Sequence, residues 1–251
     1  MHKHKLQILT RGGLANKLRT LLTGMYAADE TERDLEIGWE SCRGCRMFYD
    51  DFFMPIDNVR IEREDTKIIP NFERIYNTLG NFEDIKKYDN NQNLLSVTCG
   101  NINCGSISAD DIVKKKRHLV SPKKEIADEI EEYAAKHFNN KTIGFHIRSA
   151  EHFLNITSIK AREEIIDKIP NEIGIYIAVD NIEVKEYLLN KYGNRIIYKE
   201  KSFGFDNNPG MRDAVIDMYL LNRCAKIYGT RTSSYSWAAS IIKKDTETIM
   251  L

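Results

Sequence analysis

The second half of the chain alternates short apolar runs with amphipathic stretches, and this alternation constrains the fold more than any other feature of the sequence. The apolar runs have the length and composition of buried strands, at residues 142–147, 173–179, 195–198 and 226–229. Stretches with helical spacing separate and follow them, at residues 161–168, 182–191, 211–224 and 233–242. Strands that alternate with helices indicate βαβ units, so we expect an α/β fold with a parallel sheet.

The first part of the chain begins in the same way. A predicted strand at 6–9 is followed by a glycine-rich turn, a helix and a second strand at 35–39. Aromatic residues are frequent between Trp39 and Phe53, where they either pack in a core or stack on a bound sugar. The pattern therefore predicts a second α/β layer in this half of the chain.

A basic stretch at residues 114–124 precedes an amphipathic helix at 125–138 and is the best candidate for a domain boundary. Ser121 before Pro122 suits a helix N-cap followed by proline at the first helical position. We therefore expect two domains, residues 1–120 and residues 121–251.

Charge and composition exclude several classes of protein. The chain has 37 Lys and Arg and 37 Asp and Glu residues, and the parts before and after Val120 are each neutral, which excludes a nucleic-acid binder that relies on bulk charge. A hydrophobic content of 42% excludes a disordered chain. The sequence has no run of about 18 apolar residues that would span a membrane, and its start has no apolar segment of a secretory signal. We expect a cytoplasmic protein.

The five cysteines are an odd number, which favours reduced thiols. Cys42-x-x-Cys45 has a spacing suited to zinc, and Cys99 and Cys104 would complete a set of four thiolates. The two pairs are far apart in sequence, so small buried or loop thiols are the favoured interpretation. We expect no resident metal, and a zinc-stabilised interaction module is an alternative.

Ligands of parallel sheets bind at the carboxyl ends of the strands, so polar residues at strand ends are candidates for a site. After the first strand, Gly12 and Gly13 allow the backbone to approach a ligand at the start of a helix, whose N-terminus favours an anion. A tight turn with Asn16 as a helix cap explains the same residues. Both interpretations remain open on the local sequence.

The strand at 142–147 ends in a second candidate. Alternation places His146 and Arg148 on the same side of the chain, and a guanidinium at this point is suited to a diphosphate. Glu151 follows within reach of the same edge. Asp180 follows the next strand, where it either faces this edge or caps the helix that begins near residue 182.

Two further candidates lie near the end of the chain. Asp217 falls on an almost wholly apolar helix, where a carboxylate needs hydrogen-bond donors or its pKa rises. The turn after residue 229 leads into a helix and is rich in hydroxyl groups, which makes a good seat for phosphate. Its candidate residues are Thr232, Ser233, Ser234 and Tyr235.

Four of these segments, in this order, resemble the motifs of the fucosyltransferase superfamily, which includes α1,2- and α1,6-fucosyltransferases and protein O-fucosyltransferases. Residues 12–18 are similar to its glycine turn, and His146-Ile-Arg148 is similar to its H-x-R motif. Residues 176–180 resemble its strand that ends in aspartate, and residues 217–236 resemble its helix followed by glycine and hydroxyl residues. Ser149 stands where many members have a second arginine, which the protein O-fucosyltransferases also lack.

The resemblance implies a GT-B-like fold, with two Rossmann-like parallel-sheet lobes and the donor site in the cleft. Residues 1–120 would form the acceptor-side lobe, and residues 121–251 would form the lobe that binds a nucleotide sugar. The implied function is that of an inverting, metal-independent glycosyltransferase, which transfers fucose from GDP-fucose to a hydroxyl of a glycan or peptide. The alternative within this fold is a non-catalytic protein that binds a nucleotide sugar.

Three residues would have catalytic roles in such an enzyme. The resemblance implies that Arg148 stabilises the leaving diphosphate and that Asn16 lies beside the reacting sugar carbon. Glu151 is the candidate general base, because it follows the strand that carries the arginine. The remaining donor-binding residues would be Gly12, Gly13, His146, Asp180, Asp217, Thr232, Ser233, Ser234 and Tyr235.

Overall fold

The computed structural model describes residues 4–64, 73–75, 94–98, 107–148, 159–204 and 207–251. The chain forms two compact units, each described by itself below. The N-terminal unit comprises Met1–Lys123 and Phe205–Asn208, and the C-terminal unit comprises Lys124–Gly204 and Pro209–Leu251. The predictions for Cys99, Cys104 and Glu151 lie outside the described residues.

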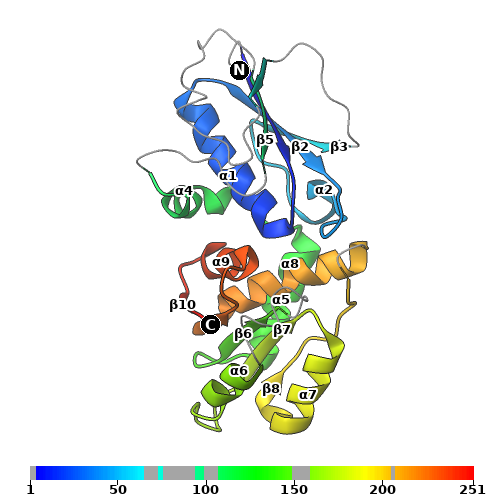
Figure 1. Cartoon of the computed structure of the whole chain (residues 1–251), viewed down its shortest axis with the longest axis vertical. Helices are drawn as coiled ribbons and strands as arrows, with labels where there is room; N and C mark the ends of the chain where they lie inside the picture. The colour runs from blue at the N-terminus through cyan, green and yellow to red at the C-terminus, as the bar shows by residue number, and fades with distance from the viewer. Residues whose placement is uncertain (1–3, 65–72, 76–93, 99–106, 149–158, 205–206) are drawn as a thin grey trace. The chain divides into compact units, whose positions relative to one another are not determined.

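The N-terminal unit is built on five parallel strands in the order β3-β2-β1-β5-β4 (Figure 1). These strands are β1 (Lys5–Thr10), β2 (Asp34–Glu40), β3 (Val59–Glu64), β4 (Glu73–Ile75) and β5 (Leu94–Thr98). Its described helices are α1 (Leu14–Glu30), α2 (Tyr49–Phe52), α4 (Ala109–Lys116) and the 3-10 helix η1 (Arg117–Leu119). The two strands and the helix expected at the start of the chain are β1, β2 and α1.

Helix α1 packs closely on the sheet at a residue that has no side chain. A Cβ atom at Gly24 would lie 2.5 Å from Cδ1 of Ile8 on β1. Leu21 and Leu22 of the same helix are buried, and full burial of such side chains contributes about 1.5–3 kcal/mol each. This close packing on β1 therefore fixes the position of α1, the helix that follows the glycine turn.

The aromatic segment packs in the core of this unit. Trp39, Tyr49 and Phe53 are all buried. The ring centroids of Trp39 and Tyr49 are 5.3 Å apart in an edge-to-face arrangement, and those of Tyr49 and Phe53 are 5.1 Å apart in a stacked one. Of the two interpretations of this segment, core packing is therefore correct for these three rings.

Ser121 and Pro122 do not begin a helix, contrary to the expectation from sequence. The carbonyl of Ser121 accepts a hydrogen bond of 2.9 Å from the N–H of Met54, and Pro122 forms a bridge with Phe53. The following helix, α5 (Lys124–His137), starts two residues beyond the proline. Pairing with a segment distant in sequence uses the backbone that a helix cap would need, which is why the local pattern is misleading.

The C-terminal unit has a second parallel sheet, with the strand order β10-β9-β6-β7-β8. Its strands are β6 (Ile143–Ile147), β7 (Ile175–Val179), β8 (Ile196–Ile197), β9 (Lys226–Gly229) and β10 (Glu247–Met250). Its helices besides α5 are α6 (Ile159–Ile166), α7 (Ile182–Tyr192), the 3-10 helix η2 (Gly193–Arg195), α8 (Asn208–Arg223) and α9 (Ser234–Ile241). The parallel α/β organisation expected from the alternation is confirmed, although β10 was not expected and β8 is shorter than expected.

Helices cover both faces of this sheet. Phe145 of β6 packs on one face in a cluster with Ile166 of α6 and Leu188 of α7. On the opposite face, a Cβ atom at Gly144 would lie 2.9 Å from Cδ2 of Leu221 and 3.0 Å from Sγ of Cys224, so α8 packs closely on β6 and a larger residue would displace these side chains. In the described residues, no helix is both long enough and apolar enough to cross a membrane.

Replacing Gly144 with alanine should lower the free energy of unfolding by about 1–3 kcal/mol, because the added Cβ overpacks the contact with α8. Urea denaturation measures this loss. Leu221→Ala makes room at the same point, so the double variant should lose less stability than the two single variants together. A Gly144→Ala variant as stable as the parent would contradict this close approach.

Candidate functional site

Three polar residues come together at the carboxyl ends of three neighbouring strands of the C-terminal unit. Ile147 of β6 is paired with Val179 of β7, so Arg148 and Asp180 each lie one residue beyond the same step of the ladder. The Nε atom of Arg148 is 3.4 Å from Oδ2 of Asp180, and the two side chains are 28% and 13% exposed. The guanidinium is therefore held beside a carboxylate while it still reaches the surface.

Thr230, which follows β9, joins this edge from the other side of β6. Its Oγ1 accepts a hydrogen bond of 3.1 Å from the N–H of Arg148 and donates one of 2.9 Å to the carbonyl of His146. Its own N–H donates to Oγ of Ser236, at 2.9 Å. The sequence reasoning missed Thr230 and Ser236 as parts of the site, although both lie in the hydroxyl-rich segment after residue 229 that it singled out, Ser236 within α9.

His146 is buried on the face of the sheet that contacts α9. Its Nδ1 is 2.6 Å from Oγ of Ser236, and its ring centroid is 4.8 Å from that of Tyr235. Burial, together with the nearby charges of Arg148, Arg162 and Lys201, lowers the pKa of His146 to about 3. The imidazole is therefore neutral near pH 7 and contributes packing and a hydrogen bond rather than a charge.

The hydroxyl-rich turn between β9 and α9 has an unusual backbone and one hydroxyl that is already bonded. Thr232 has a φ of +61°, and Ser233 occupies the N-cap position of α9 without a capping bond from its side chain. The hydroxyl of Tyr235 donates a hydrogen bond of 2.5 Å to the carbonyl of Ala214 on α8. Burial raises the pKa of Tyr235. The hydroxyl of Tyr235 is therefore used by α8, and Ser234 lies in the first turn of α9.

Asp180 is not the cap of the following helix, which was one of the two interpretations of this residue. The N-cap of α7 is Asn181, whose Oδ1 accepts hydrogen bonds from the N–H groups of Glu183 and Val184, at 2.8 and 3.1 Å. Because the neighbouring amide side chain caps the helix, the carboxylate of Asp180 is available to Arg148. The sequence carried this signal, since asparagine is as good an N-cap as aspartate.

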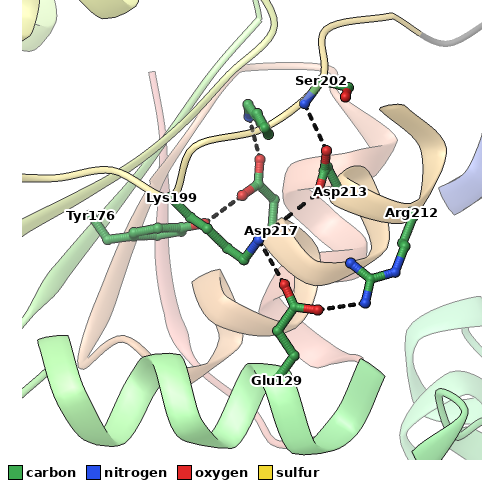
Figure 2. A network of polar contacts seen from close by, with 8 residues as sticks. Glu129, Tyr176, Lys199, Ser202, Arg212, Asp213 and Asp217 are labelled. Carbon is green, nitrogen blue, oxygen red and sulfur yellow. Dashed lines mark hydrogen bonds and ion pairs between the residues drawn. The ribbon is translucent and has the colours of Figure 1, made fainter. Parts of the chain in front are cut away.

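Asp217 lies in a buried polar network (Figure 2). Its carboxylate accepts hydrogen bonds from the hydroxyl of Tyr176 and from Nζ of Lys201. The side chains of Lys201 and Asp217 are only 8% and 7% exposed, so each charge is compensated by the other. The donors that an acidic residue on an apolar helix requires are thus present.

The same network continues toward α5. Nζ of Lys199 lies 2.8 Å from Glu129 and 3.9 Å from Asp213, and the N–H of Ser202 donates to Asp213 at 2.8 Å (Figure 2). Arg212 bonds to the other oxygen of Glu129. These contacts hold the segment that follows β8 against α5 and α8. The structure therefore places Asp217 among structural partners, and its role in binding a donor stays a prediction.

The glycine turn belongs to the N-terminal unit. Gly12 has a φ of +84°, which favours glycine, and Gly13 is the N-cap of α1. Asn16 is the third residue of α1 and does not occupy the cap position, so the interpretation of Asn16 as a helix cap is wrong. Lys17, which the sequence reasoning did not single out, is buried and donates a hydrogen bond to the carbonyl of Glu40.

Cys42 and Cys45 are free thiols that face each other across a tight turn. Their backbones form an antiparallel bridge, and the thiol of Cys42 lies 3.7 Å from the carbonyl oxygen of Gly12. Burial raises the pKa of Cys45 to about 12. Within the described residues, no three or more His, Cys, Asp or Glu side chains gather in a way that could hold a metal ion. The other pair of the zinc alternative lies outside those residues.

Replacing Asn181 with alanine should lower the free energy of unfolding by about 1 kcal/mol, because α7 loses its side-chain cap. Asp180→Asn is the matched control, since it leaves the cap in place and should cost less. Urea denaturation of both variants measures the difference. A larger loss of stability in Asp180→Asn than in Asn181→Ala would show that Asn181 is not the cap.

Stability should fall as the pH is lowered from about 6.5 toward about 3, in part because of His146. The folded state binds a proton at His146 with a pKa of about 3, whereas the unfolded chain binds it at about 6.5, so the unfolded state takes up more protons in this window. The expected slope is up to about 1.4 kcal/mol per pH unit. His146→Gln removes this proton, so denaturation at several pH values should show a shallower slope in the variant. Equal slopes would contradict a neutral, buried His146.

Comparison of the sequence with protein-family models and with curated proteins found no match. Comparison with solved structures found NodZ α-1,6-fucosyltransferase from Bradyrhizobium, co-crystallised with GDP, at 19% identity and a TM-score of 0.67, over 96% of this chain and 93% of that one. POFUT1 in complex with GDP matches at 8% identity and a TM-score of 0.65, over 100% of both chains. A mutant of Arabidopsis thaliana FUT1 in complex with GDP matches at 15% identity and a TM-score of 0.61, over 96% and 68%. The α/β, GT-B-like fold expected from the sequence is therefore confirmed as the fold of these fucosyltransferases.

Proposed function

We propose that this protein is an inverting, metal-independent glycosyltransferase that transfers fucose from GDP-fucose to a hydroxyl of a glycan or peptide. One observation carries the proposal: Arg148 lies partly exposed at the carboxyl end of a central strand, where Asp180 lies beside its guanidinium and Thr230 bonds its backbone N–H. The fold supports it as well, because the solved structures that share this fold include fucosyltransferases with GDP and GDP-fucose.

The proposed chemistry is a direct displacement. The acceptor oxygen forms a bond to the anomeric carbon of the sugar while the bond from that carbon to the diphosphate breaks, so GDP leaves and the anomeric configuration inverts. Negative charge develops on the diphosphate in the transition state, and the main task of the protein is to stabilise it. Asp180 lies beside Nε of Arg148, and in this proposal the guanidinium binds the diphosphate through charge-assisted hydrogen bonds.

Arg148 would do the work that a divalent cation does in other glycosyltransferases. The sequence contains no Asp-x-Asp pair of the kind that binds such a cation together with a nucleotide sugar. His146 would remain neutral beside the arginine and would support the turn that carries Ser233 and Ser234 through its contact with Ser236. Metal independence predicts that turnover survives an excess of chelator.

Two further roles belong to the proposal and rest on the motifs alone. Asn16 would act beside the reacting sugar carbon, and Glu151 would take the proton of the acceptor hydroxyl. Glu151 lies outside the described residues. The donor contacts proposed for Gly12, Gly13 and Thr232 have the same basis.

Arg148→Ala should lower kcat by at least about 10²-fold while the protein stays folded, because the departing diphosphate loses its main counter-charge. Arg148→Lys keeps the charge but loses the planar guanidinium, so its kcat should lie between those of the parent protein and Arg148→Ala. The measurement is release of GDP from GDP-fucose in the presence of candidate acceptors. Arg60→Ala removes a surface arginine that is 64% exposed on β3, and it is the matched control. Retained turnover in Arg148→Ala would overturn the site.

The nucleotide is tested separately by thermal unfolding with GDP, UDP and dTDP. A ligand at 100 times its dissociation constant stabilises the protein by about 2.7 kcal/mol, so the preferred base should be evident. A larger shift with UDP than with GDP would contradict the proposed donor. Binding of GDP without any transfer to a broad set of acceptors would instead favour a non-catalytic nucleotide-sugar-binding protein.

A further inference from the structure

A second arginine lies near the end of β6, at a position that the sequence motifs do not indicate. Arg162 of α6 is fully buried, and its Nη2 donates a hydrogen bond of 2.9 Å to Oγ1 of Thr230. A guanidinium is costly to remove from water, and few are found so deep in a protein interior. Its position is therefore a feature of the fold that calls for a physical reason.

The oxygen of Thr230 connects this arginine to Arg148. Oγ1 accepts one hydrogen bond from Nη2 of Arg162 and another from the N–H of Arg148, and it donates its own proton to the carbonyl of His146. A hydroxyl can accept two hydrogen bonds and donate one, so all of its capacity is used. The guanidinium of Arg162 and the backbone of Arg148 are thus separated by a single atom.

The charge of Arg162 reaches the site as well. Burial lowers the pKa of Arg162 to about 10, so the side chain is still a cation near pH 7. Its charge acts at His146, whose pKa is lowered first by burial and then by Arg148, Arg162 and Lys201. Charges in a buried environment are weakly screened by salt, so Arg162 would attract a dianion bound at Arg148.

We propose that Arg162 is a positioning residue of the donor site, which fixes the end of β6 through Thr230 and adds a second positive charge behind Arg148 without touching the donor. The inference rests on the proposed function, because it takes the bound group to be a nucleoside diphosphate. Arg162 would then strengthen the binding of the diphosphate part of the donor and leave the binding of the nucleoside part unchanged.

The test compares GDP with guanosine, which lacks the diphosphate, as ligands of the full chain in calorimetric titrations at one ionic strength. Arg162→Gln keeps a donor for Thr230 and removes the charge. This variant should weaken the binding of GDP by about tenfold or more, equivalent to about 1.4 kcal/mol. Its affinity for guanosine should equal that of the parent protein. Arg162→Lys keeps the charge and should preserve most of the preference for GDP over guanosine.

Two outcomes overturn the inference alone. Arg162→Gln could bind GDP as tightly as the parent, or it could lose affinity for GDP and guanosine by the same factor, as a merely structural role requires. A parent protein that binds GDP no better than guanosine overturns the proposed function, and the inference with it. The parent measurement therefore separates the two failures.

A second pair of variants covers the case in which Arg162→Gln does not fold. Thr230→Val removes the shared oxygen at nearly constant side-chain shape. It should reduce the preference for GDP over guanosine by about threefold or more. Thr230→Ser keeps the hydroxyl and should retain the preference. An unchanged preference in Thr230→Val would show that the link through Thr230 does not act on the diphosphate.

Discussion

The parallel hydrogen-bond ladder that joins β6 to β7 and β9 is the constraint on which the candidate site depends. Parallel strands end at the same edge of a sheet, so residues that are far apart in the sequence arrive there together. Arg148, Asp180 and Thr230 meet for this reason, and Asp180 and Thr230 each contact Arg148. Thr230 is fully buried, and its hydrogen bonds to Arg148 and His146 leave little freedom in the geometry of this edge.

Much of this arrangement could be predicted because the relevant signals are local. Alternation along a strand placed His146 and Arg148 on one side, and strand–helix alternation predicted the parallel sheet that the structure confirms. The choice between two local explanations was harder. Asp180 and Asn181 are both good helix caps, and only the structure shows that Asn181 caps α7. The roles of these residues in a reaction stay predictions, because the fold alone does not test them.

The remaining features depend on contacts between segments that are far apart in sequence. Nothing local distinguishes Arg162 from a surface arginine on a short helix, and its burial against Thr230 follows from how α6 packs on the sheet. Asp217 shows the same limit, since an apolar helix predicts that it needs donors but not that Tyr176 and Lys201 supply them. Ser121 has the local pattern of a helix cap, and pairing with Met54 overrides it.

Helix α8 is held at three levels along its length. Its C-terminal half abuts the bare backbone of Gly144, Asp217 is bonded in its middle, and the carbonyl of Ala214 receives the hydroxyl of Tyr235. A helix tied in this way has little room to slide or rotate, so α9 and its first turn are supported by a fixed body. A ligand bound at this turn, as proposed, would require little reordering of the protein, so that part of the entropy cost of binding would be small.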